Sequence, residues 1–579
     1  MEKRWLVKPV ADRSIIDQFP ELNNIIVQLL FNRGLTSQAA IDDFLNPSYD
    51  DHSHSPFLFS DMEQAVGRIF AAIRQKEKIM IYGDYDADGV CASAILFSTL
   101  KAFGADVDIY IPFRDTEGYG LNQKVVKRII NQGFQLLITV DCGIANKEEI
   151  EILNQGGVAV IVTDHHQEPP TLPQALAIIN PMVKNSGYPF PFLSGAGVAF
   201  KLCQALAISQ EQLDFPVKLP AGFEKWLMDL VAIATIGDIM PLIGENRVLV
   251  KYGLIVLNQT RRPGLQKLIE ATNGSAKIDS QYVGWRIVPR LNAAGRINHA
   301  SVAFDLLTTD SVSVAAKLVD ILEKNNKDRQ NLTDKILREA DKQVIEQVEK
   351  NKILWTVGDD WPTGILGLVA GRLCDRHHRP VLAVSRQQEA TKKGGKYVGS
   401  GRSISVFDIT AALKKNDHLL ERYGGHSQAC GFSVSGQDNF LKFQDSLSQL
   451  ANQAITKEDL KSIVDIDADI NLEEVNWNLV GELEKFAPFG EGNLSPLFLI
   501  RQLNIEQLYP VGNDGQHLKV IVSQNGSPAK HKLIGFSFGD WCAKLKVGDK
   551  IDIVFELGVN EWNGNRELQL KLMDLRLSS

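Results

Sequence analysis

Residues 78–90 of this 579-residue chain read KIMIYGDYDADGV, a short apolar run followed at once by three aspartates among glycines. An apolar run of this length that ends at glycine fits a buried strand, and the pattern from Val90 to Phe103 fits a helix. Strand, polar loop and helix in this order are typical of an α/β fold, in which ligands bind beyond the carboxyl ends of the strands. The stretch therefore predicts a site at the edge of a sheet.

Three similar apolar runs follow at residues 106–111, 136–140 and 158–162, with a helical pattern at Asn122–Asn131. This alternation predicts a mainly parallel sheet with helices on both faces. The motif DCG follows the run at 136–140, and TDHH follows the run at 158–162. A further apolar run, LVAIATI, precedes a fourth polar motif, GDIMP, so we expect Asp238 to end another strand at the same edge.

Composition limits the class of protein. The chain is 44% hydrophobic and 23% charged, and it is too long for a single core, so we expect several globular domains. No apolar run approaches the roughly 18 residues of a membrane span and no signal-type core follows the first residues, which predicts a cytoplasmic location. The six scattered cysteines form no CxxC pair, which argues against structural zinc and a disulfide framework.

The net charge of −8 by itself favours a metabolic enzyme over a nucleic-acid-binding protein, because phosphate binding rests on Lys and Arg. Residues 371–405 depart from this balance, with eight basic residues against Asp375 and Glu389. The basic residues are Arg372, Arg376, Arg379, Arg386, Lys392, Lys393, Lys396 and Arg402. A basic stripe on an acidic protein fits a channel better than a whole binding face.

Asp84, Asp86 and Asp88 occupy alternate positions, so an extended segment would place their carboxylates on one side. Three uncompensated carboxylates this close require a cation. The spacing matches the start of a calcium-binding loop, but the twelfth residue counted from Asp84 is Ile95, where such a loop needs a glutamate. The pattern therefore predicts a cation site of another kind.

TDHH adds Asp164, His165 and His166 to this set, and Asp141 and Asp238 extend it. A single aspartate after a strand is usually a turn or cap residue, but four acidic motifs at one sheet edge are better explained by a metal centre. Mixed carboxylate and imidazole ligands favour Mn²⁺ or a similar ion over Mg²⁺ or Ca²⁺. Two ions bridged by a carboxylate would account for so many ligands and would suit phosphoester hydrolysis.

The chain is predicted to divide into five parts. Residues 311–350 are charged and helical without Gly or Pro, as expected of a long linker helix. An N-terminal segment (1–50) and the catalytic domain (51–310) precede it, and a smaller α/β domain (351–458) follows. The last part (459–579) has β-rich runs separated by turn residues, which predicts a small barrel.

Ten motifs occur in the order GDYDADG, PFRDTEGYGL, VDCG, TDHH, IGDIMPL, PRLNAAGR, GILGLVAGRL, GSGRS, YGGH and FAPFGEGN. They resemble the DHH phosphoesterase superfamily, and nearly the whole chain is similar to the bacterial single-strand-specific exonucleases of that superfamily. The resemblance implies an α/β fold with a mainly parallel-sheet DHH catalytic domain, a long linker helix and a smaller α/β DHH-associated domain. It also implies a C-terminal OB-fold β-barrel that binds single strands.

By this resemblance, two Mn²⁺ ions, with Mg²⁺ as the alternative, are held by Asp84, Asp86, Asp88, Asp141, His165 and Asp238. The implied catalytic residues are Asp141, which bridges the ions, Asp164, which orients the ligands, and His166, which stabilises charge at the phosphate or assists proton transfer. The chain departs from the family where it reads GVCASA after the aspartates, because a hydroxyl is missing at Cys91 and Ala92. Metal binding should survive this change.

The resemblance also implies substrate contacts. Ser400, Gly401 and Arg402 would hold the 5′-terminal phosphate, because glycine permits close backbone approach and arginine is a forked donor. Tyr119 would stack on a base, unless it is a core residue. The other expected substrate-binding residues are Arg114, Asn292, Arg296, Gly425 and His426. For Arg114 the alternative is a surface residue at a strand edge.

The implied function is a 5′→3′ exonuclease that hydrolyses single-stranded DNA to 5′-mononucleotides in DNA recombination and repair, with duplex DNA excluded by a narrow channel. Expected partners are single-stranded-DNA-binding protein and a RecQ-type helicase. One alternative is a DHH oligonucleotide or cyclic-dinucleotide phosphodiesterase, which lacks the C-terminal barrel. The other is a non-catalytic single-strand-binding scaffold, although every expected ligand is present.

Overall fold

The computed structural model describes residues 3–114, 116–212, 215–272, 277–387, 395–524, 529–562 and 565–578. The chain forms two compact units. One unit is Ser53–Leu460, and the other joins Met1–His52 to Lys461–Ser579. The second unit therefore combines two segments from opposite ends of the sequence.

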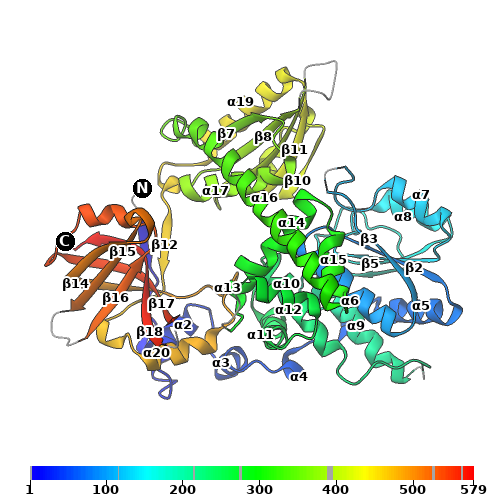
Figure 1. Cartoon of the computed structure of the whole chain (residues 1–579), viewed down its shortest axis with the longest axis horizontal. Coiled ribbons are helices and arrows are strands. Elements are labelled where there is room, and N and C mark those ends of the chain that lie inside the picture. Colours follow the sequence, from blue (N-terminus) through cyan, green and yellow to red (C-terminus); the bar gives the residue numbers. More distant parts are fainter. Residues whose placement is uncertain are drawn as a thin grey trace. The chain divides into compact units, whose positions relative to one another are not determined.

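The first unit contains a five-stranded parallel sheet in the order β3-β2-β4-β5-β6. The strands are β2 (Lys78–Gly83), β3 (Asp106–Tyr110), β4 (Leu136–Val140), β5 (Ala159–Thr163) and β6 (Ala177–Ile179). One face is covered by α7 (Gln123–Asn131) and α8 (Lys147–Gln155), and the other by α5 (Met62–Gln75), α6 (Ala87–Ala102) and α9 (Gly195–Gln212) (Figure 1). The predicted parallel sheet is confirmed, and the burial of its central strands explains their continuous apolar sequences.

The prediction that Asp238 ends a strand of this sheet is wrong. The run LVAIATI lies in helix α10 (Met228–Gly237), and Asp238 is the residue that ends this helix. A buried helix and a buried strand both read as continuous apolar sequence, so periodicity does not separate them in a short run. Other helical elements of the unit are η1 (Pro56–Leu58), η2 (Glu224–Leu227), α11 (Gly244–Asn258), α12 (Pro263–Ala271), α13 (Ser280–Tyr282), the π-helical η3 (Val283–Ile287), α14 (Val288–Ile297) and α15 (Ser301–Thr308).

Helix α16 (Val312–Ile345) is continuous and lies where the long helix was predicted. Its second half packs through Ile336, Ala340 and Val344 into the core of a smaller α/β layer. The sheet of this layer has the order β10-β11-β9-β8-β7, with only β7 and β8 parallel. Its elements are β7 (Leu354–Asp359), α17 (Thr363–His377), β8 (Val381–Gln387), β9 (Lys396–Arg402), α18 (Ile409–Lys414), η4 (Asp417–Leu419), β10 (Arg422–His426), β11 (Ala429–Ser435), α19 (Gln437–Ala454) and η5 (Glu458–Leu460).

The second unit contains a five-stranded barrel, closed because β14 pairs with both β15 and β17. Its strands are β14 (Leu497–Val511), β15 (His517–Gln524), β16 (Lys530–Gly535), β17 (Lys550–Trp562) and β18 (Asn565–Leu577). The unit also contains α1 (Arg13–Ile16), α4 (Tyr49–His52), β13 (Ala468–Asp469), η6 (Leu472–Glu474), α20 (Trp477–Leu483), η7 (Glu484–Phe486), η8 (Asn513–Gly515) and η9 (Gly539–Ala543). The predicted C-terminal barrel is confirmed.

The N-terminal segment belongs to this barrel unit. Strand β1 (Arg4–Val7) pairs in parallel with β12 (Ile463–Ile466). Apolar residues of α2 (Asn24–Phe31) and α3 (Gln38–Leu45) share one core with the barrel strands. No local pattern in the sequence indicated this long-range association.

None of the helices in the described ranges is long and apolar enough to cross a membrane. All six cysteines are free thiols, and five of them are buried, whereas Cys542 is half-buried.

Candidate metal centre

The aspartate-rich loop closes around the N-terminus of α6. Asp86 is the N-cap residue, and its carboxylate accepts hydrogen bonds from the backbone N–H groups of Asp88 (2.9 Å) and Gly89 (3.1 Å). This cap satisfies amides that have no partner within the helix. A Cβ atom on Gly89 would lie 2.7 Å from the backbone of Asp84, so glycine is needed for the loop to close.

The prediction of an extended segment with three carboxylates on one side is wrong, because the helix begins at Ala87. Asp88 therefore lies in the first turn of α6. It is buried, and its two oxygens accept hydrogen bonds from the backbone N–H groups of Gly195 and Ala196, each at 2.7 Å. Sequence reasoning missed this anchor, although the SGAG motif there is a glycine-containing helix start that suits a carboxylate.

Asp141 directly follows β4 and has a left-handed backbone, with φ of 60°. Such a conformation is unfavourable for a residue other than glycine and often marks a functional position. Its side chain packs tightly against α9, since a Cβ atom on Gly195 would lie 2.5 Å from Asp141 Oδ1. The surrounding backbone thus fixes the direction of this carboxylate.

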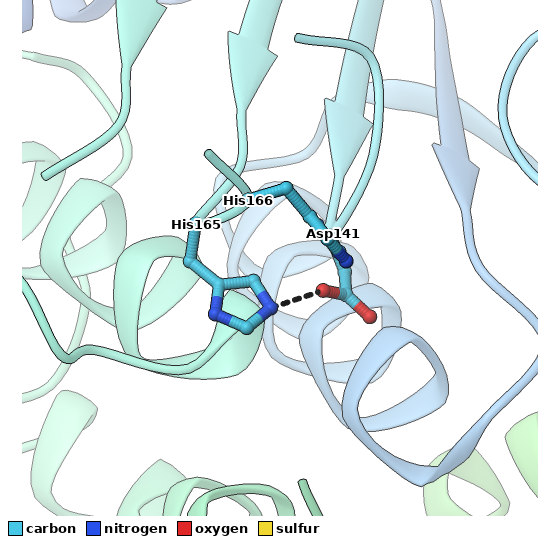
Figure 2. A group of neighbouring side chains, drawn as sticks. All are labelled: Asp141, His165 and His166. Carbon is cyan, nitrogen blue, oxygen red and sulfur yellow. Dashed lines mark ion pairs between the residues drawn. The ribbon is translucent and has the colours of Figure 1, made fainter. Parts of the chain in front are cut away.

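Three carboxylates surround Nε2 of His165. It lies 3.1 Å from Asp141 Oδ1, 3.6 Å from Asp238 Oδ2 and 3.7 Å from Asp88 Oδ2. Figure 2 shows the His165 ring and the Asp141 carboxylate directed toward one another. Burial, with the neighbouring charge of His166, lowers the pKa of His165 to about 4. The ring is therefore neutral at neutral pH, as a metal ligand must be.

His166 has different surroundings. Its Nδ1 atom lies 2.8 Å from Asp164 Oδ1 and 3.0 Å from the hydroxyl of Tyr119. Burial disfavours the charged ring, but the hydrogen bond and the charge of Asp164 outweigh burial and raise the pKa of His166 to about 9. Asp164 is fully buried and also accepts hydrogen bonds from the backbone N–H groups of His165, His166 and Ile144. It orients both histidines.

Three overlapping groups of side chains each offer ligand atoms within 4.8 Å of one another. The groups are Asp84, Asp86 and Asp141; Asp141, His165 and His166; and Asp88, His165 and Asp238. Asp141 and His165 each belong to two groups. The fold thus brings all six predicted ligands together, and it separates Asp88 from the other two aspartates of its loop.

The electrostatics of these groups fit divalent cations. Burial, with the charge of Asp86, raises the pKa of Asp88 to about 7, and burial with the charge of Asp88 raises the pKa of Asp238 to about 8. The pKa values of Asp84 and Asp141 are also raised, first by burial and then by neighbouring carboxylates. Among the described residues, Asp84 Oδ1 and Asp141 Oδ1 accept no hydrogen bond. Buried carboxylate oxygens without donors are costly, and a cation would satisfy them.

The substrate-binding residues predicted in the DHH part surround this centre. Arg296 is half-buried and donates a hydrogen bond to the Gly364 carbonyl (2.8 Å), and the Arg114 guanidinium lies 4.9 Å from the centre of the Tyr85 ring. Tyr119 is 44% exposed and is not a core residue. Asn292 accepts a hydrogen bond from the backbone N–H of Ala87 (2.8 Å), so its carbonyl oxygen supports the aspartate loop.

The residues predicted in the DHH-associated part lie on two strands. Ser400, Gly401 and Arg402 are on β9, where Arg402 donates to the Gly401 carbonyl (2.9 Å), and Gly425 and His426 are on β10. His426 acts electrostatically on the metal centre, because it lowers the pKa of His165 further, in addition to burial and the charge of His166.

Three of the predicted arginines form one positively charged group. Burial, and then the charge of Arg114, lowers the pKa of Arg296 to about 9, with Arg402 contributing as well. Burial also lowers the pKa of Arg402, and Arg114 again contributes. The structure therefore brings Arg114, Arg296 and Arg402 together beside the carboxylates.

The expectation that residues 371–405 form a basic stripe is largely wrong. Four of the basic residues are paired with acidic side chains: Arg372 with Asp334, Arg376 with Asp341, Arg386 with Asp359 and Lys396 with Glu421. Lys392, Lys393 and Glu389 lie outside the described residues. A local count of charges does not reveal partners that are distant in sequence.

Comparison with known proteins agrees with this geometry. The chain matches the N-terminal domain of the DHH family at residues 78–235, the DHHA1 domain at 330–453 and the RecJ OB domain at 466–574. It is 34% identical to the single-stranded-DNA-specific exonuclease RecJ of Bacillus subtilis, over 99% of this chain and 71% of the relative. Identity to the Escherichia coli RecJ exonuclease is 33%, over 88% of this chain and 89% of the relative.

The crystal structure of RecJ from Thermus thermophilus in complex with Mn²⁺ superimposes with a TM-score of 0.82 and 30% identity, over 100% of this chain and 80% of that chain. The fold and the carboxylate and histidine centre therefore define a phosphoesterase of the DHH class. Within that class, the chain belongs to the RecJ family.

Proposed function

We propose that this chain is a metal-dependent exonuclease that hydrolyses single-stranded DNA from a free 5′ end and releases 5′-mononucleotides, in DNA recombination and repair. The convergence of six carboxylate and imidazole ligands carries the proposal. The relatives named single-stranded-DNA-specific exonucleases support the choice of substrate.

We assign one cation to Asp84, Asp86 and Asp141 and a second to Asp88, His165 and Asp238, with Asp141 shared because it lies 3.1 Å from His165. Bound divalent cations would supply an activated water and neutralise charge on the phosphoryl oxygens. The imidazole ligand favours Mn²⁺, and solved Thermus relatives are complexes with Mn²⁺ and with Mg²⁺.

His166 is assigned the role of charge stabiliser or proton donor. Because Asp164 raises the pKa of His166 to about 9, the ring carries a proton at Nδ1 and a second at Nε2 at neutral pH. The Nε2 proton can then be donated to the phosphate or to the leaving oxygen, where negative charge develops. Asp164 holds the ring, and Tyr119 contacts the same Nδ1 atom.

The arginine group is assigned to the phosphates of the strand. Arg114, Arg296 and Arg402 repel one another, and a phosphate would relieve this repulsion through charge-assisted hydrogen bonds. Ser400 and Gly401 would bind the 5′-terminal phosphate beside Arg402. Asn292, Gly425 and His426 complete the set of proposed contacts, and Tyr119 presents a partly exposed ring to a base.

The two alternatives have less support. A phosphodiesterase of short oligonucleotides or cyclic dinucleotides does not explain residues 466–574, which match the RecJ OB domain. A non-catalytic scaffold does not explain the retention of all six ligands in one place.

The test uses single-stranded and duplex DNA labelled at either end, incubated with the full chain and Mn²⁺ or Mg²⁺. We expect mononucleotides from the 5′ end of single strands only. Asp141→Ala should abolish the activity, while Asp310→Ala, which removes an exposed carboxylate before α16, should not. Release from the 3′ end, equal digestion of duplex DNA, or an active Asp141→Ala protein would contradict the proposal.

By analogy with this function, we propose a cytoplasmic site of action together with single-stranded-DNA-binding protein and a RecQ-type helicase. A mixture of the chain with each candidate should raise the rate of digestion of long strands above the sum of the separate reactions.

A further inference from the structure

The helical stretch Val283–Ile297, formed by η3 and α14, combines positive charge with an exposed aromatic ring. Its sequence, VGWRIVPRLNAAGRI, contains three arginines and no acidic residue; Arg290 is paired with Glu323, and of the three only Arg286 is exposed. Trp285 in the π-helical turn is 77% exposed. Indole rings are rarely left in water, so an isolated exposed Trp on a positively charged helix calls for a ligand.

The backbone that carries Trp285 is packed next to the metal centre. A Cβ atom on Gly284 would lie 3.7 Å from Ile236 Cγ2, and a Cβ atom on Gly237 would lie 3.1 Å from Val288 Cγ2. Both Ile236 and Gly237 immediately precede Asp238. The turn that carries Trp285 is therefore packed on the end of α10 that presents this carboxylate.

The other end of the same helical stretch reaches the aspartate loop. Asn292 and Arg296 lie seven and eleven residues after Trp285 in the same continuous helical stretch, which is π-helical over Val283–Ile287 and α-helical from Val288. Asn292 accepts a hydrogen bond from Ala87 in that loop, and the charge of Asp86 acts on Arg296. The stretch thus runs from the loop to Trp285, a length of at most about 16 Å.

We propose that Trp285 is a platform on which an unpaired base of the DNA substrate stacks, a few nucleotides from the cleaved end. This inference rests on the proposed function. A base in a single strand has a free π-face and a duplex base does not, so the platform would select single strands without reading sequence. The exposed Arg286 beside it supplies the positive charge that a DNA backbone requires, which favours nucleic acid over an apolar protein surface as the occupant.

Next to Asp238, Ile239 is 69% exposed and adds an apolar side chain just beyond the end of α10. A base held by Trp285 would have the exposed Arg286 beside it to contact its phosphates. This arrangement of aromatic and basic groups is the one that binds single strands with little sequence preference.

The experiment compares the parent chain with Trp285→Ala, Trp285→Phe and the control Ile345→Ala, which removes a 67% exposed apolar side chain at the end of α16. The first readout is kcat and KM on 5′-phosphorylated strands of about 4 to about 16 nucleotides, a range set by the site sizes of single-strand binders. The second is equilibrium binding, without divalent cations, of strands in which one nucleotide at a time is abasic.

For Trp285→Ala we expect KM on long strands to rise at least about fivefold, the weakest effect typical of a lost base stack, with kcat little changed. Trp285→Phe should keep most of the affinity, and Ile345→Ala all of it. In the parent, one abasic position should weaken binding, and Trp285→Ala should be insensitive to that position. Trp285→Gln serves as a second variant if the alanine protein is unstable.

The inference is overturned if the parent digests single strands but Trp285→Ala and Trp285→Gln keep its KM and its sensitivity to abasic positions. That outcome would assign Trp285 to a protein partner. If the parent does not digest single strands at all, the proposed function fails, and the binding measurement still reports on Trp285 separately.

Discussion

Replacing Asp238 with asparagine should stabilise the protein in the absence of divalent cations, although it removes a proposed ligand. The folded environment raises the pKa of Asp238 from 3.8 to about 8. A difference of one pKa unit corresponds to about 1.4 kcal/mol, so holding the ionised group in place costs about 6 kcal/mol at and above pH 8. Burial is the largest cause of this cost, and repulsion from Asp88 and Asp86 follows. Because neighbouring carboxylates share the cost, removing one charge should recover about half of it, roughly 3 kcal/mol.

The sign of the pH dependence follows from the direction of the shift. The folded protein binds a proton at Asp238 more tightly than the unfolded chain does, so the cost is absent below about pH 4 and grows as the pH rises to about 8. At pH 5 the same reasoning leaves a gain of only roughly 1 kcal/mol. The parent should therefore lose stability between these pH values more steeply than Asp238→Asn.

Thermal unfolding in EDTA, followed by circular dichroism at pH 5 and pH 8, measures this difference. We expect the melting temperature of Asp238→Asn to exceed that of the parent by a few degrees at pH 8 and by much less at pH 5, with Asp310→Asn unchanged. Added Mn²⁺ should reverse the order, because the parent binds it more tightly. Equal melting temperatures at pH 8, or an equal gain at both pH values, would refute the reasoning.

Three further predictions concern single positions. Gly195→Ala should reduce activity by about 100-fold, because its Cβ would lie 2.5 Å from Asp141 Oδ1, whereas the Cβ of the control Gly197→Ala would lie at an ordinary 3.4 Å from Leu193 and leave the enzyme active. Equal rates for the two variants would show that this packing does not determine activity. Asp164→Asn should shift the alkaline loss of activity from about pH 9 toward pH 6.5, because His166 then loses its proton at lower pH. If the alkaline side of the pH–activity profile did not move, His166 would not be the titrating group. Lys201→Met should destabilise the protein by about 3 kcal/mol or more, because it leaves the charge of the buried Glu245 without its cationic partner. Lys201→Met/Glu245→Gln should recover part of the loss in a denaturant titration.

The central sheet was predictable because its strands are buried on both faces and its motifs follow the strands directly. Asp84, Asp141 and His165 could be placed at one edge on that basis alone. Asp238 was assigned to the correct site through an incorrect strand, since a buried helix and a buried strand share the same apolar sequence. The resemblance to a family, rather than periodicity, made its inclusion secure.

Other features depend on contacts between segments distant in sequence. The hydrogen bonds from Gly195 and Ala196 to Asp88 join two helices more than a hundred positions apart. The ion pairs that neutralise Arg372 and Arg386 likewise join residues of different helices or strands. Trp285 was missed because an exposed aromatic residue is identified by its surroundings and not by its neighbours in the sequence.

The pairing of β1 with β12 has a consequence for biosynthesis. Residues 1–52 leave the ribosome about 400 residues before Lys461–Ser579, the segment with which they share a core. At a translation rate of about 5–20 residues per second, they wait roughly 20–80 s for that partner. During this time the apolar faces of α2 and α3 are without their native cover, so the nascent chain should be a substrate for chaperones that bind exposed apolar helices until the barrel is complete.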